Sequence, residues 1–126
     1  MKNLLLVLMF TPFLAFAQDG MPQISKALSA GDADALGAYF DENIELSILE
    51  EEGIVNKTQA LRKVKRFLSS NTVSSFSEVH RGATRSSDSR YLIGILTTSS
   101  GTFRVTIYLT QNSGDLIIQE FRFDSE

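Results

Sequence analysis

The chain of 126 residues carries 12 basic and 15 acidic side chains, a formal net charge of −3, and no cysteine. Proteins that bind nucleic acids or anionic membranes show an excess of basic residues, so we expect neither partner. The absence of cysteine excludes disulfides, thiolate metal ligands and a cysteine nucleophile. The chain contains 43% hydrophobic residues, which is typical of a globular domain. Without disulfides, such a domain is held together by its apolar core alone.

The first residues predict a secretory signal peptide over residues 1–17. Lys2 supplies the positive charge, residues 4–16 are almost entirely apolar, and Ala15 and Ala17 form a small-x-small cleavage pattern. A membrane-spanning helix needs about 20 apolar residues, so this run is too short to be an anchor. We therefore expect cleavage near Ala17, a mature chain of residues 18–126 with no integral membrane segment, and a periplasmic or secreted location.

The mature chain starts with two predicted helices, over residues 22–30 and 33–40. The first carries apolar side chains at the i, i+3, i+4 spacing of an amphipathic helix and stops at Gly31. Asp32 is placed to cap the second helix. A third helix is predicted from residue 57 to about residue 69, with Asn56 and Gln59 as a capping box.

Strands are predicted on both sides of the third helix. Residues 44–48 alternate apolar and polar, and residues 54–55 form a short returning strand after an acidic turn. Residues 76–81 form another strand, in which Phe76, Glu78 and His80 are expected to share one face. Residues 90–124 then hold three β-rich runs separated by two glycine-containing turns, which predicts an antiparallel meander.

Alternation along the meander predicts two faces of different character. The apolar face, which the helices should cover, is expected to consist of Tyr91, Ile93, Ile95, Phe103, Val105, Ile107, Leu109, Ile117, Phe121 and Phe123. The mixed face is expected to consist of Leu92, Gly94, Leu96, Arg104, Thr106, Tyr108, Leu116, Ile118, Glu120 and Arg122. A β-bulge would exchange the two faces of any one strand.

Several short stretches carry a family resemblance. They are residues 24–32 with Leu36 and Tyr39-Phe40, Ser75-Phe76 followed by Val79-His80-Arg81-Gly82, and residues 101–105. On these residues the chain resembles a family of small secreted bacterial proteins, domain of unknown function 4783, within the nuclear transport factor 2-like superfamily. The resemblance spans essentially the whole mature chain.

The resemblance implies an α+β, nuclear transport factor 2-like (cystatin-like) cone. About three N-terminal helices would pack on a curved, mostly antiparallel sheet of four long strands and one or two short ones, as one domain over residues 18–126. The superfamily includes enzymes such as ketosteroid isomerase and scytalone dehydratase, as well as ligand-binding and dimerisation modules. No catalytic residue of those enzymes aligns with this chain, and fold alone does not define function.

Three residues are weak candidates for catalysis. His80 is the only histidine, so it can act as a base only if a carboxylate such as Glu78 orients it. Glu45 is a further pocket carboxylate. A hydrogen-bonded structural role for His80 is the simpler interpretation, and the sequence shows neither a metal site nor a cofactor motif.

Arg104, Tyr108, Glu120 and Arg122 form a second candidate set, because all four are expected on the mixed face. Arg104 and Glu120 are predicted to pair across neighbouring strands. The set suits either binding of an anionic or hydroxylated ligand through bidentate arginine contacts or an interface with ordinary ion pairs. The interface is the preferred interpretation, because the apolar residues of this face make a bare surface unfavourable.

The sequence supports three hypotheses of function. The leading one is an exported, non-enzymatic module that dimerises through its sheet and holds a small ligand in its cavity. The second is a cavity enzyme of the isomerase or dehydratase kind, which would use His80, Glu78 or Glu45. The third is an envelope-associated protein-interaction module. An interior filled by Phe40, Phe67, Phe103 and Phe121 would exclude the enzyme.

Overall fold

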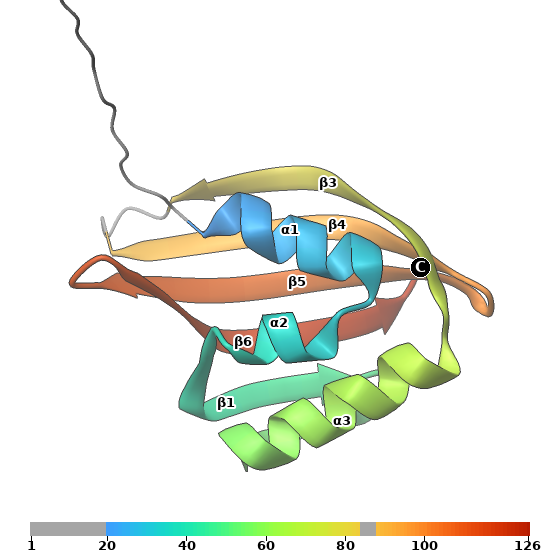
Figure 1. Cartoon of the computed structure of the whole chain (residues 1–126), viewed down its shortest axis with the longest axis horizontal. Coiled ribbons are helices and arrows are strands. Elements are labelled where there is room, and N and C mark those ends of the chain that lie inside the picture. The colour runs from blue at the N-terminus through green and yellow to red at the C-terminus, as the bar shows by residue number, and fades with distance from the viewer. Residues whose placement is uncertain (1–19, 84–87) are drawn as a thin grey trace, which may run out of the picture.

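The computed structural model describes residues 20–83 and 88–126, so the predicted signal peptide lies outside the described residues. Within these ranges the chain forms three helices and six strands, and Figure 1 labels all of them except β2. The helices are α1 (Met21–Ala30), α2 (Ala33–Gly37) and α3 (Lys57–Ser70). The strands are β1 (Phe40–Ile48), β2 (Glu51–Asn56), β3 (Val73–Ala83), β4 (Ser89–Thr98), β5 (Gly101–Asn112) and β6 (Asp115–Ser125).

The six strands form one curved sheet in the order β2-β1-β6-β5-β4-β3. All neighbours are antiparallel except β1 and β6, which run parallel. The three helices lie on one side of the sheet, which we call the inner face (Figure 1). The opposite side, which no described helix covers, is the outer face. The predicted α+β class with helices on a curved, mostly antiparallel sheet is therefore confirmed.

Local signals place most helix boundaries where they were expected. The side chain of Asn56 accepts a hydrogen bond from the backbone N–H of Gln59, and the Gln59 side chain accepts one from Asn56 in return. This capping box starts α3 at Lys57 as predicted. Gly31 adopts the left-handed conformation that ends α1.

The second helix ends at Gly37 and not at residue 40 as predicted. The chain then enters the sheet, where the backbone N–H of Ile118 donates a hydrogen bond to the carbonyl of Tyr39 at 2.6 Å. Phe40 faces Ile118 as the first residue of β1. The pairing of Phe40 with β6 thus overrides the helical pattern that residues 38–40 show in the sequence.

The two predicted faces of strand β4 are exchanged in the structure. Leu92, Gly94 and Leu96 are buried under the helices, whereas Ile93 and Ile95 lie on the outer face. The alternation of residues 91–96 is apolar on both faces, so hydrophobicity alone does not decide between them. Packing does decide, because the Phe76 ring lies so close to Gly94 that a Cβ there would be 2.3 Å from Cζ.

A bulge in β6 corrects a second part of the predicted faces. Tyr108 faces Glu120 but its neighbour Leu109 faces Ile118, so Gln119 is an extra residue in the ladder. Leu116 and Ile118 are consequently buried on the inner face, together with Phe121 and Phe123 beyond the bulge. One inserted residue keeps both apolar pairs in the core.

A bulge at Val79 changes the relation between the two candidates on β3. Glu78 faces Gly94 and points to the inner face, whereas His80 faces Ile93 on the outer face. The expectation that Glu78 and His80 share a face is therefore wrong. The inserted residue reverses the alternation between them.

Candidate functional site

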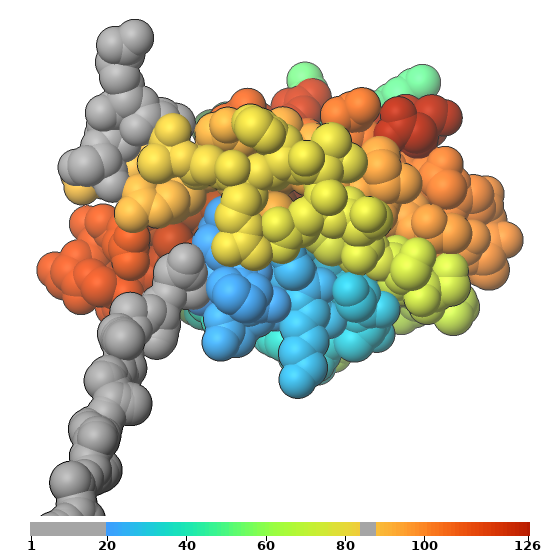
Figure 2. All heavy atoms as spheres, turned by 90° about the horizontal axis from the view of Figure 1, so that it is seen from above, coloured from blue at the N-terminus to red at the C-terminus, as the bar shows by residue number. Residues whose placement is uncertain are grey.

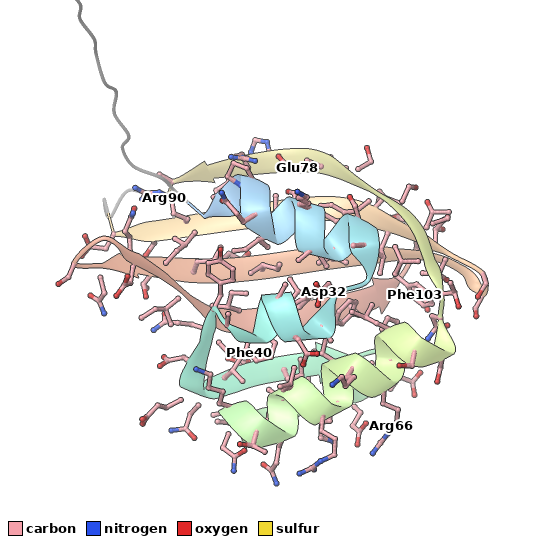
Figure 3. All side chains as sticks on the ribbon, viewed as in Figure 1. Asp32, Phe40, Arg66, Glu78, Arg90 and Phe103 are labelled. Atoms are coloured by element: carbon pink, nitrogen blue, oxygen red, sulfur yellow. The ribbon has the colours of Figure 1, made fainter. Side chains whose placement is uncertain are left out.

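The space between helices and sheet is filled by aromatic side chains. Phe40 packs edge-on against Phe121 at a centroid distance of 6.1 Å, and Phe67 packs against Phe103 at 5.1 Å. All four are at most 8% exposed, and Figure 3 labels Phe40 next to α2 and Phe103 toward the C-terminal end of α3. The interior between helices and sheet is therefore occupied by the protein's own core.

A broad hollow of about 640 Å³ opens at the end of the sheet near the start of α1. Its ionisable lining residues are Tyr39, Lys57 and Asp115. None of the residues predicted to act in catalysis or binding lines it. The catalytic candidates and this hollow are thus separate.

His80 lies on the outer face, where it pairs with an aromatic residue of the neighbouring strand. Its Nε2 is 2.6 Å from the hydroxyl oxygen of Tyr91, and the ring centroids are 5.1 Å apart. A Cβ on Gly82 would lie 2.8 Å from the same hydroxyl, so glycine leaves room for the ring. The contact holds the Tyr91 hydroxyl close to Gly82, and His80 is directed at Tyr91 rather than at a cavity.

Glu78 binds two side chains at the junction of β3 and α1, as Figure 3 places it. It accepts a bidentate contact from Arg81, with Nε at 2.9 Å and Nη2 at 2.7 Å, and a hydrogen bond from the hydroxyl of Ser25. The hydrogen bonds from Arg81 hold the pKa of Glu78 below its ordinary value of 4.5. A carboxylate that is ionised and whose two oxygens both accept hydrogen bonds is a poor general acid. Through Ser25, Glu78 instead attaches α1 to the sheet.

Glu45 lies on the outer face of β1, with Glu120 of β6 as its register partner. Both side chains therefore project from the side of the sheet opposite the helices, outside the interior. This position removes Glu45 from the set of pocket carboxylates.

Arg122 is the centre of an ion-pair network on the outer face. Its guanidinium lies 3.4 Å from Glu120, 3.8 Å from Glu52 and 3.9 Å from Asp124. Between the strands that carry Arg122 and Glu52 lies Ser47, which is only 1% exposed and whose hydroxyl has no hydrogen-bond partner among the described residues. The network thus covers a polar group.

Arg104 and Tyr108 complete the second candidate set on β5. Arg104 pairs with Glu126 at 3.6 Å, and its register partner is Asp124. Tyr108 is 42% exposed and faces Glu120 across the strands. The predicted Arg104–Glu120 pair is therefore wrong, although all four residues project from the outer face.

Sequence reasoning missed two features of this face. Tyr91, Ile93 and Ile95 belong to it, and no periodic signal in residues 91–96 distinguishes them from their buried neighbours. The alternation of residues 44–48 predicts Ser47 on the polar side of its strand, and nothing in the sequence indicates that an arginine covers it. Within residues 20–83 and 88–126, no group of three His, Asp or Glu side chains is arranged to hold a metal ion. No helix in the same ranges is long and apolar enough to cross a bilayer.

The comparisons with known proteins agree with this architecture. The family described as Domain of unknown function (DUF4783) matches residues 21–124. The chain has the α+β, cystatin-like arrangement of helices on a curved sheet, and it belongs to the DUF4783 family. The predicted resemblance is confirmed. A search of curated proteins found no match.

Solved structures show the same relationship. A DUF4783 family protein from Bacteroides uniformis is 26% identical, with a TM-score of 0.80 over 86% of this chain and 98% of that chain. One from Bacteroides fragilis is 31% identical, with a TM-score of 0.76 over 82% of this chain and 95% of that chain. A domain of unknown function with a cystatin-like fold from Nostoc punctiforme is similar in fold alone, with 10% identity and a TM-score of 0.63 over 83% of this chain and 72% of that one.

Proposed function

We propose that the chain is an exported, non-enzymatic module that acts through the outer face of its sheet by binding a second copy of itself. The observation that carries this proposal is the filled interior. Phe67 contacts both Phe103 and Phe123, at centroid distances of 5.1 and 4.6 Å. A ligand or substrate of even a few atoms would have to displace these rings, at a cost of several kcal/mol in lost packing.

The outer face is the surface that remains for function. No described helix covers it, and it exposes Tyr108 and, at its edge, Ile54, which is 75% exposed. Aromatic and aliphatic side chains beside paired charges are typical of protein interfaces. The alternative of a cavity enzyme lacks support, because His80 and Glu45 lie outside the interior and Glu78 is bound by Ser25 and Arg81.

Export is the part of the proposal that rests on sequence alone. The charged residue, apolar run and small-residue cleavage pattern of residues 1–17 support it. Expression in a bacterial host followed by N-terminal sequencing of the periplasmic protein is expected to find Gln18 as the first residue. An intact N-terminus on a cytoplasmic protein would contradict export.

Self-association and ligand binding are separated by one pair of measurements on the mature protein. Sedimentation velocity over a wide concentration range is expected to show a monomer–dimer equilibrium. Native mass spectrometry of the same sample is expected to show no bound small molecule. A monomer at every concentration, or a stoichiometric ligand on the native chain, would overturn the proposal.

A further inference from the structure

A groove runs between α3 and the edge strand β2. It consists of two neighbouring hollows of about 130 and 210 Å³, which share Ile48, Glu51 and Lys63 in their walls. Gly53 leaves the smaller hollow empty, because a Cβ at that position would meet nothing within 4 Å. The larger hollow extends along the second half of α3 and includes Arg66. The groove therefore offers room for two side chains of a partner.

The floor of the groove is apolar. It is formed by side chains of β1, β2 and α3, namely Leu46, Ile48, Val55 and Phe67. Glu51 and Lys63 lie 3.3 Å apart at the boundary of the two hollows and neutralise each other. An apolar floor beside a neutral ion pair favours an aliphatic side chain over a charged one at the smaller hollow.

The helix that forms one wall carries an excess of positive charge. The 14 residues of α3 include five basic side chains and no acidic one. Two of the five pair with carboxylates of β2 and α2 at 3.3 Å. Among the described residues, no carboxylate lies within ion-pair distance of Arg62 or Arg66, which are exposed and one helical turn apart. Like charges at this spacing destabilise a helix unless a partner neutralises them, and Figure 3 shows Arg66 projecting from the side of α3 away from α2.

The strand that forms the other wall has a free edge. β2 is the outermost strand on its side of the sheet, so the backbone groups on its free side have no strand partner among the described residues. An extended segment of another chain can pair with such an edge through backbone hydrogen bonds. Its side chains then alternate between the two faces of the sheet, and every second one lies on the side of α3.

We propose that this groove binds an extended peptide segment of a partner protein, in which an aliphatic side chain and a carboxylate are two residues apart. The segment adds to β2 as a further strand. Its aliphatic side chain enters the hollow at Gly53, and its carboxylate accepts two parallel hydrogen bonds from the guanidinium of Arg66. Two residues span about 6.6 Å in a strand, which suits hollows that share a wall. The inference does not depend on self-association, because the proposed dimer uses the outer face and the groove lies on the inner side of β2.

The shape of the site favours a peptide over an anionic membrane, the other partner of a basic helix. A flat lipid surface reaches exposed cations but cannot reach an apolar floor between a helix and a strand. In the part of the chain that the structure describes, none of the exposed large hydrophobic side chains belongs to α3. The helix therefore has no apolar surface to insert into a bilayer.

The probe for this site is a fluorescently labelled peptide with the sequence Glu-Thr-Val-Thr-Glu and blocked termini. Its pattern places a carboxylate two residues from an aliphatic side chain in both strand directions. Fluorescence anisotropy with the mature protein is expected to give a dissociation constant of about 100 µM, because the peptide buries much less surface than a standard interface. The same peptide with lysine in place of both glutamates is expected to bind at least tenfold more weakly.

Three variants locate the contact on the protein. Arg66→Glu reverses the charge at the larger hollow and is expected to raise the dissociation constant of the Glu-Thr-Val-Thr-Glu peptide at least fivefold. Gly53→Leu fills the smaller hollow and is expected to do the same, with thermal unfolding as the check on its fold. Lys26→Glu is the matched control, because it makes the same change of charge at an exposed position of α1. It is expected to change the dissociation constant less than twofold.

Weaker binding in Arg66→Glu and Gly53→Leu but not in Lys26→Glu supports the proposed site. Equal weakening by Arg66→Glu and Lys26→Glu means a general effect of charge and overturns it. Absence of saturable peptide binding overturns it as well. If the wild type then sediments with vesicles of phosphatidylcholine and phosphatidylglycerol and Arg66→Glu does not, the basic face of α3 binds membranes instead. All of these outcomes leave the proposed function standing, because its test is the oligomeric state.

Discussion

Arg122 on β6 reaches over β1 to Glu52 on β2, and the two side chains close over Ser47 on the strand between them. The Ser47 hydroxyl is buried without a partner among the described residues. A buried hydroxyl without a hydrogen bond costs about 1–3 kcal/mol relative to its hydrated state. The ion pair on the surface thus conceals an unfavourable group below it.

Ser47→Ala is expected to leave the free energy of unfolding unchanged or to raise it by about 1 kcal/mol, because it removes the unpaired hydroxyl without leaving a large cavity. Urea unfolding monitored by circular dichroism measures the change. Ser47→Thr, which keeps the hydroxyl and adds a methyl group, is the comparison variant. A loss of more than about 1 kcal/mol in Ser47→Ala would mean that the hydroxyl binds an internal water.

Gly94→Ala is expected to destabilise the fold by about 1–3 kcal/mol, the usual cost of overpacking. A Cβ at residue 94 would lie 2.3 Å from Cζ of Phe76 and 2.6 Å from the backbone oxygen of Ser77. Gly53→Ala is the matched control, since a Cβ there meets nothing within 4 Å. Thermal unfolding compares the two, and Phe76→Leu in the Gly94→Ala background is expected to restore part of the loss. Equal stability of the two alanine variants would refute the packing argument.

The attachment of α1 to β3 is expected to depend on pH. The hydrogen bonds from Arg81 lower the folded-state pKa of Glu78 below its ordinary value of 4.5, so the ionised carboxylate stabilises the fold above that ordinary value. This contribution is lost as the pH falls through the lower, folded-state pKa. Glu78→Gln is expected to be less stable than the wild type at pH 7 and to approach it near pH 3. A stability difference that is constant over this range would exclude the linkage.

The capping box of α3 provides a further test at an exposed position. The backbone N–H of Gln59 donates to Oδ1 of Asn56 at 2.8 Å, whereas the reciprocal bond from Asn56 N–H to Oε1 of Gln59 is 3.4 Å long. Asn56→Ala is expected to cost about 1 kcal/mol of stability and Asn56→Asp much less, because aspartate keeps the acceptor. Gln59→Ala should cost less than Asn56→Ala. Chemical denaturation of the three variants gives the order, and the reverse order would contradict it.

Elements with local signals could be predicted from the sequence. The start of α3 depends on Asn56 and Gln59, three residues apart, and the turn before β6 depends on Ser113 and Gly114, whose φ angles of 51° and 90° suit a tight hairpin. These features involve neighbours in the chain. For that reason the sequence predicts the first and third helices and the hairpin meander with nearly correct boundaries.

The faces of the strands could not be predicted in the same way. Leu92 and Ile93 are equally apolar, and only the contact between Phe76 and Gly94 determines which of them is buried. The extra residues Val79 and Gln119 leave no mark in the alternation of their strands. The predicted composition of the candidate site depends on the predicted strand faces. The prediction is therefore correct for Arg104 and Tyr108 on β5 and for Glu120 and Arg122 on β6, which share the outer face. It leaves out the apolar side chains of β4 that lie on the same face.

The parallel pairing of β1 with β6 joins the first strand of the chain to the last. In the strand order of the sheet, β6 separates the pair of β1 and β2 from the three neighbouring strands β3, β4 and β5. The helices are divided between the two units, because α1 lies beside β3, as Figure 2 shows, whereas α3 contacts β1 and β2. The sheet can therefore become one unit only when β6 pairs with strands on both sides of it, and pairings between strands so far apart in sequence form slowly.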